Sequence, residues 1–122
     1  MRAAAALLVL LPGLAMGQEG RAVFEARCAS CHAMEAGAPP GPGPNLAGLA
    51  GRRVGGDQAF GYSPALEAAR AEGRTWDSAL LERFLSDPDA MFPGLWMGEN
   101  GLREAGDRAA VARFLTGPTA PR

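Results

Sequence analysis

Hydrophobic residues recur at helical spacing in four segments of this chain. The predicted helices cover about residues 20–31, 63–73, 75–85 and 103–115. Trp76, Leu80 and Phe84 share one side of the third segment, as in an amphipathic helix. No alternating pattern is long enough for a strand, and no internal repeat is visible. The pattern therefore predicts an all-α fold of about four helices.

Several helix ends carry their own signals. Ser63 is the expected N-cap of the second helix, with Pro64 at its first position and Gly73 as its stop. Pro88, after an aspartate, ends the third helix. Gly117 and the proline after it end the fourth.

The segments between the helices are long and irregular. Residues 33–62 are rich in glycine and proline and almost without periodicity, and residues 86–102 are nearly as irregular. Long loops without structure are uncommon in a small domain unless something organises them. Four short helices also give a thin core. We therefore expect a large apolar cofactor to complete the interior.

The N-terminus has the pattern of a secretory signal. Arg2 precedes the apolar run 3–11, a Pro-Gly pair breaks the run, and small residues lie just before Gln18. The run is too short for a typical membrane span. We predict that residues 1–17 are a cleaved signal peptide, that residues 18–122 form one domain, and that the protein is periplasmic. An uncleaved N-terminal anchor is the alternative.

The charge pattern excludes one class of partner. The chain has no lysine, and its 12 basic residues, all arginine, are balanced by 13 acidic ones. No basic stripe is present to neutralise phosphates, so we expect no nucleic-acid binding. No segment after residue 17 has the composition of a membrane span.

The pentapeptide CASCH, residues 28–32, contains both cysteines and the only histidine. A thiol–disulfide site normally follows a strand, which is absent here, and a structural zinc site needs four ligands. A Cys28–Cys31 disulfide would close too small a loop to stabilise the fold. The Cys-x-x-Cys-His pattern fits haem c attachment best, with thioethers at Cys28 and Cys31 and His32 as an axial ligand of the iron.

A second axial ligand must come from elsewhere. The chain has no second histidine, and Met34 is too close to His32 to reach the other face of a haem. Met91 and Met97, both in the second irregular segment, remain. Either could instead fill space in the core, which is the usual role of methionine.

Four further motifs belong to one known pattern. They are GPNLAGLAGR over residues 43–52, GYS over 61–63, Trp76, and a Pro-x4-Pro-Gly-x-x-Met spacing over 88–97. With CASCH, they resemble the small monohaem class I cytochromes c, which include mitochondrial cytochrome c and bacterial cytochromes c2. The likeness covers residues 20–116, and it implies that Gly20 and Phe24 on the first helix meet Phe114 on the last.

The resemblance also implies roles for single residues. Pro44 would accept a hydrogen bond from the second ring nitrogen of His32. Arg52, Tyr62 and Trp76 would lie at the haem propionates. The Pro-Gly spacing selects Met97 over Met91 as the distal ligand.

Some positions depart from the family pattern. Phe84 stands where a tyrosine is usual, Leu66 replaces an asparagine, and Leu95 replaces the threonine before the ligand. Glu99 replaces an aromatic residue that usually covers the haem edge. These changes remove hydrogen-bond donors from the methionine side of the haem. The missing lysines argue against a strongly acidic docking partner.

The function predicted from these features is one-electron transfer between redox partner proteins, by a monomer that is not an enzyme. Histidine and methionine would fill both axial positions and leave none for a substrate. Two alternatives stay open: a peroxidase-like haem enzyme or sensor with a labile Met97, and a cytochrome subunit permanently docked on a dehydrogenase.

Overall fold

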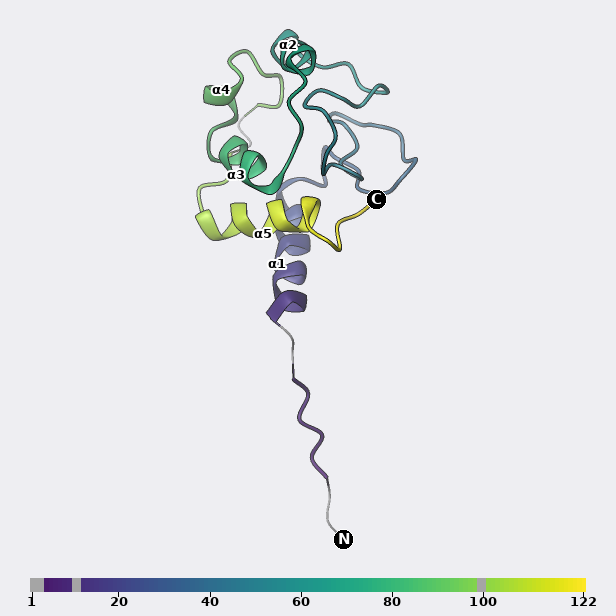
Figure 1. Ribbon diagram of the computed structural model, residues 1–122, viewed down its shortest axis with the longest axis vertical. Coiled ribbons are helices and arrows are strands. Elements are labelled where there is room, and N and C mark those ends of the chain that lie inside the picture. Colours follow the sequence, from purple (N-terminus) through teal and green to yellow (C-terminus); the bar gives the residue numbers. More distant parts are fainter. Residues whose placement is uncertain (1–3, 10–11, 99–100) are drawn as a thin grey trace.

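The computed structural model describes residues 4–9, 12–98 and 101–122, without the side chains of residues 12–17. Five helices occur in this described part and no strand: α1 (Pro12–Arg27), α2 (Pro64–Glu72), α3 (Ser78–Ser86), α4 (Pro88–Met91) and α5 (Ala105–Thr116). The expected all-α class is therefore confirmed. Figure 1 shows the helices around long loops, with the N-terminal segment leading away from the globular part.

The ends of α2 follow the predicted signals. The Ser63 hydroxyl accepts a hydrogen bond from the Leu66 N–H, with a distance of 3.4 Å between Oγ and N. Pro64 is the first helical residue, and Gly73 ends the helix in the left-handed conformation with φ of 77°. A glycine is favoured there because it has no Cβ to clash at positive φ.

The predicted start of the third helix at Thr75 is wrong by three residues. Asp77 caps α3, its Oδ1 lying 2.7 Å from the Leu80 nitrogen. Thr75 instead forms an isolated antiparallel bridge with Arg53, and the Trp76 N–H donates to the Arg52 carbonyl at 2.9 Å. These long-range bonds hold Trp76 outside the helix and against the glycine-rich loop.

Other boundaries also differ from the sequence expectation, and α1 begins at Pro12 rather than at about Gly20. The first helix ends at Arg27 rather than at Cys31, and residues 28–31 form a turn in which the His32 N–H donates to the Cys28 carbonyl at 3.0 Å. Pro88 ends α3 as expected, but it also begins the short helix α4, which Asp87 caps. A residue that stops one helix can start another because proline is tolerated in a first turn.

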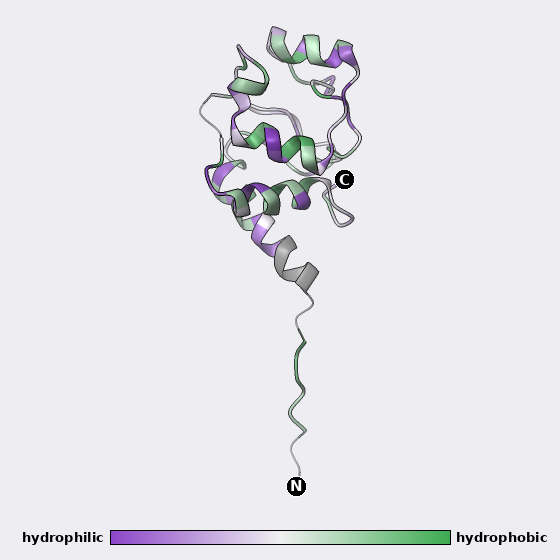
Figure 2. Cartoon of the chain, turned by 60° about the vertical axis from the view of Figure 1, so that its left-hand side comes forward, coloured by the Kyte–Doolittle hydropathy of each residue, from purple (hydrophilic) through white to green (hydrophobic). Residues whose placement is uncertain are grey.

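The core forms where α1 and α3 each pack on α5 (Figure 1). Phe24 of α1 and Phe114 of α5 are buried with their ring centroids 6.0 Å apart, so the expected contact between first and last helix is present. Leu80, Leu81 and Phe84 of α3 are also buried. Figure 2 shows hydrophobic and hydrophilic residues interleaved along α3 and α5, as expected of helices with one buried face.

No helix among the described residues is long and apolar enough to cross a membrane.

Candidate functional site

A cavity of about 240 Å³ lies where the irregular segments meet α3 and α5. Its walls are mostly apolar and include Leu81 and Leu85 from α3, and Val111 and Leu115 from α5. All of the predicted site residues line it: Cys28, Cys31, His32, Pro44, Arg52, Tyr62, Trp76 and Met97. The fold thus brings together residues that are up to 69 positions apart in the sequence, the separation of Cys28 from Met97.

The two cysteines lie in the turn after α1. Cys28 is half-buried and Cys31 is exposed, and both are free thiols. Burial raises the pKa of the Cys28 thiol, while the charge of Arg27 opposes the shift and Cys31 adds to it. A redox-active thiol needs a lowered pKa. Within the described residues, no three His, Cys, Asp or Glu side chains come together as a metal site. The thiol–disulfide and zinc interpretations therefore gain no support.

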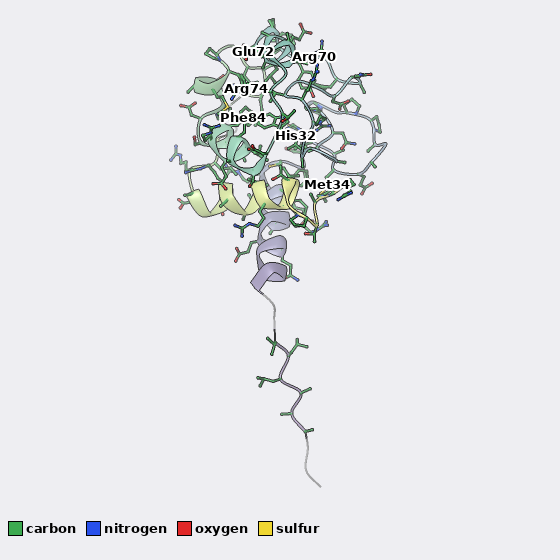
Figure 3. The ribbon with its side chains drawn as sticks, viewed as in Figure 1. His32, Met34, Arg70, Glu72, Arg74 and Phe84 are labelled. Atoms are coloured by element: carbon green, nitrogen blue, oxygen red, sulfur yellow. The ribbon has the colours of Figure 1, made fainter. Side chains whose placement is uncertain are left out.

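The His32 ring is held in one orientation. Its Nδ1 lies 2.8 Å from the Pro44 carbonyl oxygen, as the resemblance implied. Burial lowers the pKa of the imidazole; the Pro44 bond raises it, and the charge of Arg52 lowers it further. A neutral ring that donates from Nδ1 keeps a lone pair on Nε2, the state that binds a metal. Figure 3 shows His32 near the middle of the globular part.

Gly43 leaves room for this ring. A Cβ at Gly43 would lie 2.5 to 3.0 Å from three atoms of the imidazole, closer than real side chains approach. The Gly43 N–H also donates to the Cys31 carbonyl at 2.9 Å, which holds the loop against the cysteine turn. The absence of a side chain at Gly43 is therefore required for His32 to lie against the Pro44 segment.

The methionines differ in their relation to the cavity. Met97 is partly buried and lines the cavity wall, in a loop where Gly94 takes a positive φ of 87°. Met34 and Met91 are also partly buried against the core, but neither lines the cavity. Of these three, only Met97 could present its sulfur to a group bound there.

A polar network lies along one side of the cavity. Arg52 donates from Nη2 to the Asn45 carbonyl at 2.7 Å, and the Tyr62 hydroxyl accepts from the Asp57 N–H at 3.0 Å. Trp76 is 9% exposed and packs on Phe84 with centroids 5.2 Å apart. Asn45 and Asp57 were missed by the sequence analysis. Asn45 lies within the GPNLAGLAGR motif, which could have indicated it, whereas nothing near Asp57 marked it as part of a site.

The departures from the family pattern fall on the cavity wall. Leu66, Phe84 and Leu95 all line it, so apolar groups stand where the pattern has polar ones. Glu99, the fourth departure, lies outside the described residues.

The chemistry of the lining fits haem c. The cavity combines apolar walls, two thiols, a neutral imidazole and a thioether, and Gly43 keeps the imidazole side free of a Cβ. Thiols provide covalent attachment, and imidazole with thioether is a known pair of iron ligands. The two arginines on the wall, Arg27 and Arg52, match a cofactor that carries acidic groups.

Comparison with known proteins gives the same result. The cytochrome c family model matches residues 17–116. Cytochrome c2 of Agrobacterium tumefaciens (strain II Chrys) is 42% identical over 97 residues, covering 80% of this chain and 86% of the relative. Cytochrome c of Stellaria longipes is 35% identical over 102 residues, covering 84% of this chain and 92% of the relative. The chain therefore belongs to the cytochrome c family, as a class I monohaem member with one covalently attached haem c and its iron.

Proposed function

We propose that this protein is a one-electron carrier whose haem is attached at Cys28 and Cys31 and ligated by His32 and Met97. One observation carries the proposal: the oriented His32 ring and Met97 line the same cavity, whereas Met34 and Met91 do not. The iron of a haem c supplies a reversible ferric–ferrous couple. With both axial positions taken by side chains, no position remains for a substrate, which supports a carrier rather than an enzyme.

The surrounding residues hold and shield the cofactor. Pro44 orients His32 by its carbonyl, and Leu81, Leu85 and Val111 exclude water from the interior. We assign Arg52, Tyr62 and Trp76 to the haem propionates, because a guanidinium, a hydroxyl and an indole N–H can each donate to a carboxylate. All three line the cavity.

The protein is proposed to work in the periplasm, after removal of residues 1–17. The N-terminal charge and apolar run support export. Gly20 and Phe24, through which α1 packs on α5, both lie beyond the cleavage point. The domain over residues 18–122 therefore keeps this helix contact after processing.

The partners are proposed to be redox proteins that dock at the cavity margin, each with one monomer. Trp96 is 71% exposed while also lining the cavity, and exposed tryptophans are enriched at binding hot spots. The chain has no lysine to form a strongly basic face. A partner surface that is only mildly acidic and partly apolar suits this margin best.

The ligand assignment is tested by a matched pair of variants. Met97→Ala is expected to lose the sulfur-to-iron charge-transfer band at the red end of the ferric spectrum, because the thioether is removed. Met91→Ala is the control and is expected to keep the band. The opposite result would assign the distal ligand to Met91. If both variants kept the band, neither methionine would be the ligand.

One observation favours a second candidate function. The apolar residues Leu66, Phe84 and Leu95 line the cavity where the family pattern has polar ones. If the Met97 thioether were to dissociate, the iron would be open to a small ligand. A haem enzyme or sensor would result. The carrier is expected to bind carbon monoxide slowly in the ferrous state at neutral pH, and rapid binding would favour the open site.

A further inference from the structure

Asp57 lies in the glycine-rich loop, five positions from both Arg52 and Tyr62, and the proposed function gives it no role. It is half-buried. One carboxylate oxygen, Oδ1, accepts from the Ala59 N–H at 3.0 Å, and the other, Oδ2, accepts from the Asn45 N–H at 3.3 Å. Its own N–H donates to the Tyr62 hydroxyl at 3.0 Å. Three hydrogen bonds therefore fix the position of Asp57 and its carboxylate.

These bonds connect Asp57 to both sides of the site. Asn45, whose N–H donates to Asp57, also accepts from Arg52 through its own carbonyl, at 2.7 Å. The preceding carbonyl, of Pro44, is the one that binds His32 at 2.8 Å. A single short stretch of backbone thus links the Asp57 carboxylate to the arginine and to the proposed iron ligand.

Asp57 is of interest because the charged side chains on the cavity wall are arginines, whereas Asp57 is negative. The acidic residues of the described part contribute no side chain to the cavity wall, whereas Arg27 and Arg52 do. Asp57 is the carboxylate bonded directly to this network. Burial raises the pKa of the Tyr62 hydroxyl; the hydrogen bond from the Asp57 N–H and the charge of Arg52 lower this pKa, and the charge of the Asp57 carboxylate raises it.

We propose that the Asp57 carboxylate lowers the reduction potential of the haem, by holding a negative charge behind Tyr62 and Asn45 and partly offsetting Arg52. Ferric haem carries one more positive charge than ferrous haem, so a fixed carboxylate nearby stabilises the ferric form. The inference rests on the proposed one-electron function, because a carrier is the kind of haem protein whose potential must match its partners.

The test measures the midpoint potential of the holoprotein by spectroelectrochemical titration. Asp57→Asn removes the charge and keeps the shape of the side chain, and its potential is expected to rise. The expected shift corresponds to a roughly threefold larger ferrous-to-ferric ratio at a fixed applied potential, the size expected for a unit charge at a part-buried site. Asp57→Glu, which retains the charge, is expected to stay closer to the wild type.

Glu72→Gln is the matched control. It removes the same charge from the exposed end of α2, away from His32 in Figure 3, and salt screens such exposed charges over about 10 Å at 0.1 M. Its potential is expected to equal that of the wild type. Equal shifts in the two variants, or no shift in Asp57→Asn, would overturn the proposal. If the asparagine variant does not accumulate, Asp57→Ser provides the same measurement, because serine can still accept from Ala59.

The result is independent of the ligand test. The Asp57 variants are expected to keep the sulfur-to-iron band and slow carbon monoxide binding, so a shifted potential with an intact band supports Asp57 itself. Loss of the band in Asp57→Asn would mean that the residue acts by holding the fold, and would contradict an electrostatic role. Absence of the band in the wild type would instead contradict the proposed Met97 ligation.

Discussion

At the scale of single residues, the orientation of His32 depends on Gly43 and Pro44, which both lie against its ring. Gly43 leaves the space in which the ring lies, and Pro44 supplies the carbonyl that fixes Nδ1. The neighbouring Asn45 ties this segment to three other parts of the chain. The orientation of the His32 ring is thus set by small and neutral residues rather than by charged ones.

Gly43→Ala is expected to displace the His32 ring, because the new methyl group would overlap it. Overpacking of this kind costs about 1–3 kcal/mol, and we expect a lower free energy of unfolding for the holoprotein together with a weaker bond to Pro44. Thermal unfolding followed by the haem absorbance measures the first effect. Gly61→Ala, where a Cβ would meet open space and the glycine has no positive φ, is the control. Equal stability of the two variants would contradict the close contact.

Asn45→Ala is expected to destabilise the loop that carries Pro44. The Asn45 amide nitrogen donates to the carbonyls of Glu35 and Ala38 at 2.7 and 3.0 Å, and its Oδ1 accepts from the Ala47 N–H at 2.8 Å. At about 1 kcal/mol for each bond, the loss should be roughly 3 kcal/mol. Urea unfolding measures it, with the exposed Gln58→Ala as a control that should change little. A loss below that of the control would show that these bonds contribute nothing.

At the scale of elements, the crossing of α1 and α5 is the contact that joins the two ends of the domain. Gly20 faces the backbone of Ala110 and the side chain of Phe114, and a Cβ there would overlap both. Phe24 and Phe114 then pack one turn further along. The helices approach closely because one of them has no side chain at the crossing point.

Gly20→Ala is expected to push α1 away from α5, even though alanine favours helix more than glycine does. The free energy of unfolding should fall by about 1–3 kcal/mol because of the steric overlap. Gly106→Ala, on the exposed start of α5 with nothing near its Cβ position, is the matched control and should be neutral or stabilising. A stabilised Gly20→Ala would mean that helix propensity outweighs the crossing contact.

At the scale of the whole molecule, the helices pack on one another at α5 and, together with the loops, also surround the cavity. Leu81 and Leu85 of α3 and Val111 and Leu115 of α5 all face it. The loops contribute most of the remaining wall, together with Arg27 of α1, the turn after it, and Leu66 of α2. These apolar side chains border a space that a large apolar cofactor would fill.

A Cys28→Ser and Cys31→Ser double variant is therefore expected to lose its tertiary structure along with covalent attachment. Near-UV circular dichroism should flatten, and amide exchange in α3 should approach that of an unfolded chain, because the cavity-lining side chains lose the partner they pack on. The single variants, each able to form one thioether, should be intermediate. A double variant with native near-UV circular dichroism would show that the protein part folds without the attached haem.

The amino-acid sequence alone was enough to predict the features that are formed by residues close together in the chain. CASCH indicated haem attachment because both thiols and the imidazole lie within five residues, and the caps of α2 were readable because a cap involves residues only a few positions apart. Met91 and Met97 could not be separated by spacing alone, and the family resemblance was needed to favour Met97.

The tertiary structure decided what depends on contacts between distant segments. Thr75 and Trp76 leave the helical pattern because they pair with Arg53 and Arg52, more than 20 positions earlier. Asp57 joins the site only because the fold places its carboxylate beside Asn45, 12 positions away. Local spacing carries no record of such bonds. Such bonds form only once the chain has folded. The chemistry of this cytochrome c is therefore readable in its motif, whereas the positions of the charges around the haem site are set by the fold.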